Sequence, residues 1–471
     1  MTTGERPDFL QRGEPARLIP VVADTSREQR VTSVLLAGMV AVPDLASKLL
    51  SAAGKPLRKT SHVSCWTEPE LANQPTELRS RADGLIVVRT GKKVWSALVE
   101  AKIGNTELDP QQVERYAELA RANGVDAVIT LSNQFVARAD HHPVRLRKSL
   151  TNRVGLYHWP WMWVLTEALL LDWNKQVEDP DQAFLIDEII RYLSHDSVGI
   201  SGFGHMGRQW KTVVNTVRNG GTLSRNSPDV VAAVSSWQQE ERDLCLNLTR
   251  HLHTPVTLRL TRRERDEPTL RMDAAVRQLV ADKTLSATIQ VPGAASEIEV
   301  TADLQTRTLR CAMQLQAPDD RKGAGARLNW LTRQLTRCHH PEVYIQAQWP
   351  GRTPPTMSTL LSIQEGGPSG LLPENSKLVP HHFQILMIRD TAGRFSGSRT
   401  FIEELEKLAI AFYDEVGQHL RAWQPRPPKP KVVEKADDTP RLQYPPTTIF
   451  EIGSESGRRV LPTQMDKPTD S

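Results

Sequence analysis

Residues 81–102, with the sequence RADGLIVVRTGKKVWSALVEAK, decide the fold that this chain is expected to adopt in its N-terminal third. Leu85–Arg89 and Val94–Lys102 are rich in β-branched residues and are separated by a short glycine-containing segment, which predicts two strands joined by a turn. Because side chains alternate between the two faces of a strand, Glu100 and Lys102 are expected on one face. The sequence therefore predicts a β-hairpin that carries polar groups at its far end.

Two carboxylates are expected to meet at this end of the hairpin. Asp83 stands just before the first strand, so pairing of the strands brings it towards Glu100. Buried charges carry a large desolvation penalty, and neighbouring carboxylates repel each other unless a cation lies between them. A hard divalent ion such as Mg²⁺ suits all-oxygen ligands, here Asp83, Glu100 and the backbone carbonyl of Ala101. These residues predict phosphodiester hydrolysis by an activated water, which Lys102 orients or deprotonates.

Helices and further strands are expected on both sides of the hairpin. Ser26 is suited to cap a helix over Arg27–Val42, and Asp109-Pro110 is a strong start for a second helix that reaches about Ala122. Strands are predicted at Val125–Leu131 and Arg153–Trp159, and helices at Trp161–Leu171 and Gln182–Leu193. The element order α, β, β, α, β, followed by a strand and helices, indicates an α/β fold.

The segment from Asp83 through sixteen residues to Glu100-Ala101-Lys102 resembles the D…ExK signature of the PD-(D/E)XK nucleases. Ala82 stands where this superfamily usually has proline, at a position that supplies no ligand. The resemblance covers roughly residues 25–160. It implies a restriction-endonuclease-like core of the α-β-β-β-α-β type and a Mg²⁺-dependent nuclease, with Mn²⁺ able to substitute, that acts on nucleic acid and most readily on DNA.

Three further residues match the superfamily in kind. Many members place a glutamate of the first helix at the metal site, which implies that role for Glu28, although the helix dipole also favours a glutamate in a first turn. Gln112 and Tyr116, four residues apart, resemble the QxxxY motif of RecB-like members and are implied to hold substrate. A capping box accounts equally well for Gln112, and core packing accounts for Tyr116.

The chain is expected to divide into five parts. These are a flexible arm (1–24), the nuclease-like domain (25–200), a helical linker (201–254), an α+β domain of unknown role (255–423) and a disordered tail rich in proline and charge (424–471). In the α+β domain we expect strands at Val256–Leu260, Thr284–Val291, Glu297–Ala302 and Arg307–Gln316, and helices at Arg327–Cys338 and Phe401–Trp423.

Composition narrows the class of protein. The 471 residues carry a net charge of only +4, so nucleic-acid binding has to depend on local clusters of basic residues. One such cluster follows the third predicted strand and suits either phosphate contacts or a solvated loop; it comprises Arg138, Arg145, Arg147, Lys148 and Arg153. The four cysteines have no paired spacing, and the first 30 residues lack an apolar signal-like stretch. We therefore expect a cytoplasmic protein that neither spans a membrane nor forms a disulfide framework.

Two functions from different classes follow from these patterns. The first is a metal-dependent DNA nuclease that serves phage defence, restriction or repair. The alternative is a non-catalytic module that keeps the nuclease fold and binds nucleic acid or a partner protein. A partner could bind the second domain or the tail, and the oligomeric state stays open.

Overall fold

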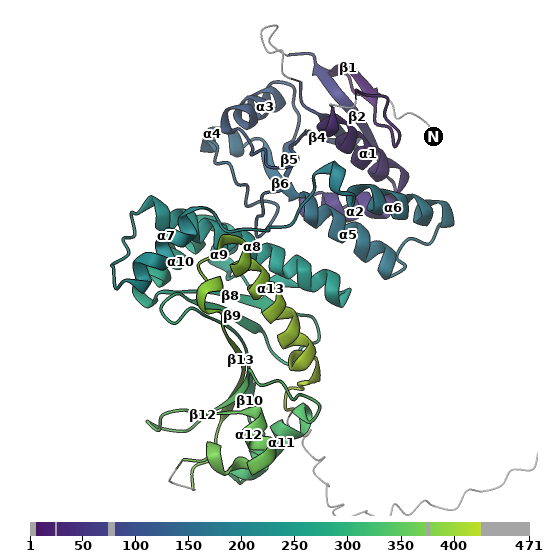
Figure 1. The fold of residues 1–471 in the computed structure, drawn as a ribbon. Helices are drawn as coiled ribbons and strands as arrows, with labels where there is room; N and C mark the ends of the chain where they lie inside the picture. The colour runs from purple at the N-terminus through teal and green to yellow at the C-terminus, as the bar shows by residue number, and fades with distance from the viewer. Residues whose placement is uncertain (1–5, 24–25, 74–80, 374–376, 425–471) are drawn as a thin grey trace, which may run out of the picture. The chain divides into compact units, whose positions relative to one another are not determined.

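The hairpin predicted from residues 85–102 lies at the centre of a six-stranded sheet (Figure 1). The strands follow one another in space in the order β1-β2-β3-β4-β5-β6. They span Leu10–Pro15 (β1), Ser61–Leu71 (β2), Gly84–Thr90 (β3), Lys93–Ala101 (β4), Ala127–Ser132 (β5) and Gly155–Pro160 (β6). The pairs from β1 to β4 are antiparallel, whereas β4, β5 and β6 run parallel. The carboxyl ends of these three strands therefore share one edge of the sheet.

The chain is described here by a computed structural model for residues 6–23, 26–73, 81–373 and 377–424. These residues belong to one compact unit. They form a mixed α/β structure with two sheets and thirteen α-helices in the described ranges, so the predicted α/β class is confirmed. The predicted disordered tail lies outside the described residues, apart from Gln424.

Helices cover both faces of the first sheet. They span Arg27–Ala41 (α1), Pro43–Ala52 (α2), Pro110–Ala122 (α3), Lys148–Thr151 (α4), Trp161–Trp173 (α5) and Pro180–Leu193 (α6). Helices α1, α2, α5 and α6 share one apolar core with the sheet, which contains Val99 and Ala101 of β4. Helix α3 packs with Leu98 of β4 on the opposite face. The alternation predicted for the second strand of the hairpin is thus present, and it directs Glu100 towards the α3 face.

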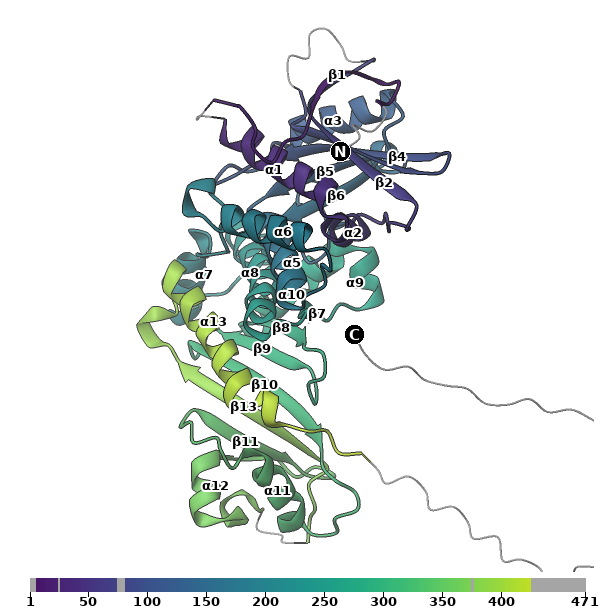
Figure 2. The same ribbon diagram turned by 90° about the vertical axis from the view of Figure 1, so that its right-hand side faces the viewer.

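The second sheet has seven strands in the order β12-β11-β13-β10-β9-β8-β7, and all its pairs are antiparallel (Figure 2). Its strands are Thr257–Leu258 (β7), Thr284–Gln290 (β8), Ile298–Asp303 (β9), Thr308–Gln316 (β10), Val343–Gln348 (β11), Thr356–Thr359 (β12) and His382–Asp390 (β13). The accompanying helices are Gln209–Arg218 (α7), Pro228–Leu252 (α8), Arg262–Asp266 (α9), Pro268–Asp282 (α10), Ala324–Thr332 (α11), Leu360–Gly366 (α12) and Ser398–Glu415 (α13). Short 3-10 turns lie at Asp196–Val198, Arg333–Leu335, Pro368–Leu371, Ala392–Arg394 and Gly417–His419.

Two expectations about the organisation of the chain are wrong. The arm predicted to be flexible contains β1, which pairs with β2 at the edge of the first sheet. The segment predicted as a helical linker, 201–254, contains α7 and α8, whose Trp210 and Trp237 are fully buried in the core of the second sheet. The glycines near residue 200 suggested a boundary, but burial of two indole rings makes the following helices part of the packed structure.

A helix crosses a membrane only if it is long enough and apolar enough. Among the described residues, no single helix is both long enough and apolar enough to do so. The pair α1 and α2 meets the criteria of length and composition only when taken together, with a bend of 111° between them. Both helices contribute buried residues to the core of the first sheet.

Candidate active site

Asp83 is held against the end of β4 by the pairing of the hairpin. Gly84, the first residue of β3, lies opposite Val99 of β4. The preceding residue, Asp83, then accepts a hydrogen bond of 2.7 Å at Oδ2 from the backbone N–H of Ala101. The contact fixes this carboxylate beside Glu100, as the sequence predicts.

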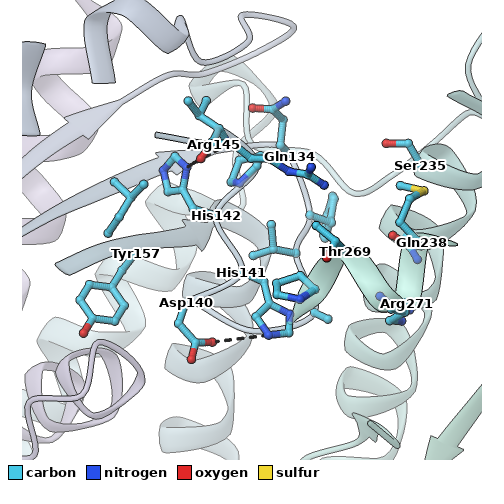
Figure 3. A pocket seen from close by; sticks show the side chains of 18 of the residues that line it. Gln134, Asp140, His141, His142, Arg145, Tyr157, Ser235, Gln238, Thr269 and Arg271 are labelled. Carbon is cyan, nitrogen blue, oxygen red and sulfur yellow. Dashed lines mark hydrogen bonds and ion pairs between the residues drawn. The ribbon is translucent and has the colours of Figure 1, made fainter. Parts of the chain in front are cut away.

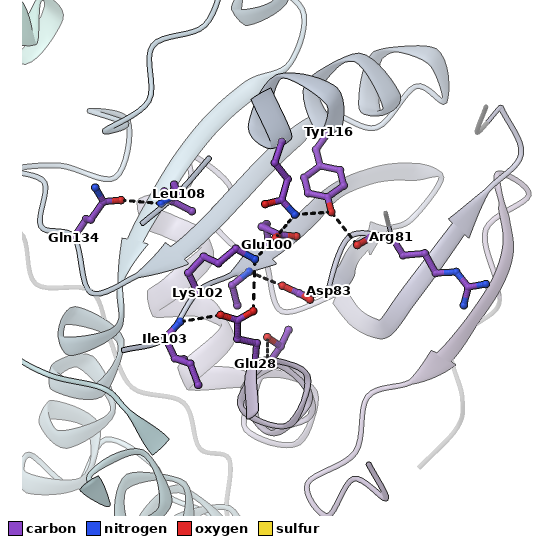
Figure 4. A network of polar contacts seen from close by, with 12 residues as sticks. Glu28, Arg81, Asp83, Glu100, Lys102, Ile103, Leu108, Tyr116 and Gln134 are labelled. Carbon is purple, nitrogen blue, oxygen red and sulfur yellow. Dashed lines mark hydrogen bonds and ion pairs between the residues drawn. The ribbon is translucent and has the colours of Figure 1, made fainter. Parts of the chain in front are cut away.

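Lys102 lies between two further carboxylates (Figure 4). Its Nζ is 2.6 Å from Oε1 of Glu100 and 3.5 Å from Oε2 of Glu28, which comes from the first turn of α1. The other oxygen of Glu28 accepts a hydrogen bond of 3.3 Å from the backbone N–H of Ile103. Trp161 donates a hydrogen bond of 2.9 Å to the backbone carbonyl of Lys102. The structure therefore brings Asp83, Glu100, Lys102 and Glu28 together.

Gln112 and Tyr116 reach the same cluster from α3. The amide Nε2 of Gln112 donates to Oε1 of Glu100 at 2.7 Å and to the Tyr116 hydroxyl at 3.1 Å. That hydroxyl in turn donates to the backbone carbonyl of Arg81 at 2.8 Å. The capping-box interpretation of Gln112 is wrong. The side chain of Asp109, the N-cap, accepts a hydrogen bond from the backbone N–H of Gln111, and the side chain of Gln112 donates to Glu100.

Burial and mutual repulsion dominate the electrostatics of the cluster. Burial, followed by the charge of Glu100, raises the pKa of Asp83 from 3.8 to about 8, although the N–H of Ala101 and the Lys102 ammonium oppose the shift. Burial also raises the pKa of Glu100, against the opposing charge of Lys102. Burial alone would lower the pKa of Lys102, but the surrounding carboxylates, Glu100 foremost, hold it above its ordinary value. Lys102 is therefore a permanent ammonium in this arrangement.

The donor set fits a hard divalent cation, provided that the cluster rearranges. Oε2 of Glu100 is buried and has no hydrogen-bond partner among the described residues, which is costly for a carboxylate oxygen and suits a cation ligand. As the side chains lie, however, no three carboxylate, imidazole or thiol groups of the described residues are placed to share an ion. The Lys102 ammonium is the cation that is paired with Glu28 and Glu100 in this arrangement. Binding of a metal would require Lys102 to move away from at least one of them.

A matched pair of glutamines on α3 tests the contact to Glu100. Gln112→Ala removes the amide that donates to Glu100, so the cleavage of nucleic acid that the resemblance implies is expected to slow by about tenfold or more, the effect of one hydrogen bond to a charged group. Gln111→Ala changes an exposed neighbour on the same helix and should cut at the wild-type rate. Initial rates measured on one substrate compare the two. Equal rates for both variants would remove Gln112 from the site.

A row of polar side chains, which was not predicted from the sequence, continues from Glu100 across the parallel strands. Glu100 lies opposite Thr130 of β5, which lies opposite His158 of β6. The Thr130 hydroxyl is 2.8 Å from Nδ1 of His158 and 2.8 Å from Nε2 of His142, and His158 also contacts the Gln134 carbonyl at 2.9 Å. The signal that could have found the row was polar residues at buried positions of the two strands, Thr130 and His158.

The two histidines predict an acid-sensitive fold. Burial lowers the pKa of His158 to about 4 and, together with the charge of His158, that of His142 to about 3. Below pH 6.5, the ordinary pKa of histidine, the unfolded chain therefore binds more protons than the folded chain. The free energy of unfolding that the protein has above pH 6.5 is then lost as the pH falls towards 4. Urea unfolding across this range should show a shallower loss for His142→Gln than for the exposed control His62→Gln. Identical pH profiles would contradict the assignment.

Other candidates from the sequence lie in ordinary structural roles. Within the basic cluster, Arg138 is bound to Asp140, and Arg147 is bound to Glu114 and Glu118. The four cysteines are free and buried; they are Cys65, Cys245, Cys311 and Cys338. Only part of the basic cluster is thus left for contact with a ligand.

Comparison with known proteins adds no assignment. No family model matches the chain. No curated protein matches it either. The geometry of the site is therefore the basis on which the function of the chain is inferred.

Proposed function

We propose that the chain is a Mg²⁺-dependent nuclease with a restriction-endonuclease-like core in residues 25–200. The order α1, β2, β3, β4, α3, β5 supports this, because it matches the α-β-β-β-α-β core apart from the inserted α2. The observation that carries the proposal is the convergence of Asp83, Glu100 and Lys102 at the end of β4, with Glu28 and Gln112 bound to the same groups. Burial of such a cluster of charges costs free energy, and groups with strongly perturbed pKa values are concentrated at functional sites.

Each residue has a definite part in this proposal. Asp83, Glu100 and Glu28, with the backbone carbonyl of Ala101, would hold the ion. When bound, Mg²⁺ or Mn²⁺ supplies a positive charge that acidifies a coordinated water and stabilises charge on the scissile phosphate. The Lys102 ammonium orients the attacking water and offsets negative charge on the phosphate, because its raised pKa opposes a role as base in this arrangement. Gln112 fixes the position of Glu100, and Tyr116 fixes Gln112.

The second candidate is a non-catalytic module of the same fold. It is favoured by the pairing of Lys102 with Glu28 and Glu100, which supplies a positive charge to the cluster without a metal. Such a module would bind nucleic acid or a partner protein through the same N-terminal fold. Metal-dependent cleavage distinguishes the two functions.

Incubation of the purified full chain with linear and circular DNA tests the proposal. Cleavage is expected with Mg²⁺ or Mn²⁺ and is expected to stop in EDTA. The same reactions with single-stranded DNA and RNA define the substrate, and cleavage of circular DNA separates an endonuclease from an exonuclease. Absence of cleavage with either ion on every substrate would favour the non-catalytic module, and cleavage that persists in EDTA would refute the metal site.

A further inference from the structure

A cavity of about 730 Å³ opens beside the loop that follows β5 (Figure 3). Its first wall comes from the segment that follows β5, with Gln134, residues 140–146 and Lys148, and its second wall comes from α8 and α10, with Ser235, Gln238 and Thr269. Pockets of about 300–1,000 Å³ are the usual size for a bound small molecule, so this cavity has room for a nucleotide.

The cavity lies at the same sheet edge as the candidate active site. Strands β4 and β5 run parallel, and Glu100 lies directly opposite Thr130, where neighbouring strands are about 4.8 Å apart. The Thr130 hydroxyl contacts His142, a residue of the cavity wall. Gln134, also in the wall, accepts a hydrogen bond of 3.5 Å from the backbone of Leu108, in the segment that follows Lys102. A nucleic-acid strand bound at Lys102 would thus have the cavity beside it.

The lining combines cations with amides. Arg145 and Lys148 are exposed and form no ion pair with any residue that the structure describes. Asp140, which carries the opposite charge, is already bound to Arg138 by two hydrogen bonds of 2.9 Å. On the opposite wall, Nε2 of Gln238 is buried, and no group in the described part of the chain forms a hydrogen bond with it. Free cations suit a phosphate, and an unsatisfied amide suits the hydrogen-bonding edge of a base.

We propose that this cavity binds one nucleotide of the nucleic-acid strand that the active site cuts, with its phosphate on Arg145 and Lys148 and its base against Gln238. The inference rests on the proposed nuclease function for the identity of the strand. Its own observations are the cavity, the two unpaired cations and the unsatisfied amide. Displacement of a nucleotide from the base stack into this cavity would also contribute to the choice of substrate.

Calorimetric titration of the full chain in EDTA tests the proposal without cleavage. The probes are deoxyadenosine 5′-monophosphate, inorganic phosphate and a single-stranded DNA of about ten nucleotides. Arg145→Ala and Lys148→Ala should each weaken the monophosphate and the DNA by about tenfold, because each removes a charged contact to phosphate. Arg147→Ala removes the same charge from the same loop but does not line the cavity, so it should change either affinity by less than about twofold.

Gln238→Met gives a second variant that is expected to fold well, because it removes an unsatisfied buried donor. It should weaken the monophosphate but not inorganic phosphate. The proposal is overturned if phosphate alone binds as tightly as the monophosphate, if Arg147→Ala weakens binding as much as Arg145→Ala, or if only the free monophosphate and not the DNA responds to the variants.

The two proposals can fail separately. Binding that responds to Arg145→Ala in a chain that never cuts nucleic acid refutes the nuclease function and leaves a nucleotide-binding cavity. Metal-dependent cleavage by a chain that binds no monophosphate refutes the cavity assignment alone.

Discussion

Replacement of Lys102 by alanine is expected to slow metal-dependent cleavage by a factor of about 100 to 1,000, the usual effect of removing one charged group that stabilises a transition state. The Lys102 ammonium lies 2.6 Å from Glu100 and 3.5 Å from Glu28, at the proposed site of cleavage. Its loss removes the positive charge that stabilises the negative charge developing on the phosphate. Single-turnover rates at saturating metal measure the effect on chemistry rather than on metal affinity.

Lys93→Ala is the matched control for this variant. Lys93 is the first residue of β4, is exposed, and carries the same charge at the opposite end of the same strand. It should cut at the wild-type rate. Circular dichroism of both variants shows whether the fold survives the substitution. A Lys102→Ala protein that is folded and as active as Lys93→Ala would contradict the assignment of the active site.

Asp83→Asn is expected to abolish metal-dependent cleavage and at the same time to stabilise the metal-free protein. Asparagine keeps an oxygen that accepts from the N–H of Ala101, but it removes one of two carboxylates that repel each other. We expect the free energy of unfolding in EDTA at pH 8 to rise by on the order of 1 kcal/mol. A cleavage assay measures the first effect. Denaturant unfolding without Mg²⁺ measures the second, and unfolding with Mg²⁺ shows the loss of the ion site, since the ion should stabilise only the wild type.

Asp126 provides the control for Asp83→Asn. Its Oδ2 accepts a hydrogen bond of 2.8 Å from the backbone N–H of Ser96, so it makes the same type of contact to the same strand. Asp126 is exposed, and Asp126→Asn should leave cleavage and the stabilisation by Mg²⁺ unchanged. If Asp83→Asn behaves like Asp126→Asn, then Asp83 only anchors the strand and holds no metal.

The parts of the fold that depend on local pattern could be predicted from the sequence. The hairpin was expected at residues 85–102, and β3 and β4 end within one residue of the predicted strands. The helix that starts at Pro110 and ends at Ala122 followed from its cap and its stop signal. The face shared by Leu309, Cys311, Met313 and Leu315 of β10 is likewise buried, as alternation predicts.

The parts that depend on tertiary contacts could not be predicted. Strand β2 contains Pro69, which argues against a strand when the sequence is read locally, and the strand accommodates it next to Glu68, whose φ is 47°. Whether the Gln112 side chain caps its helix or contacts the active site depends on the position of Glu100 on the neighbouring sheet. The row from Glu100 to His158 depends on the register of parallel strands, which no local pattern gives.

A crystal soaked with Mn²⁺ tests the central claim most directly, because the ion is located by its anomalous scattering. We predict one site, with carboxylate oxygens of Asp83, Glu100 and Glu28 about 2 Å from the ion and with Lys102 moved away from at least one of its two present partners. A crystal of fully folded protein in which no ion binds there, and in which Lys102 still bridges Glu28 and Glu100, would contradict the account.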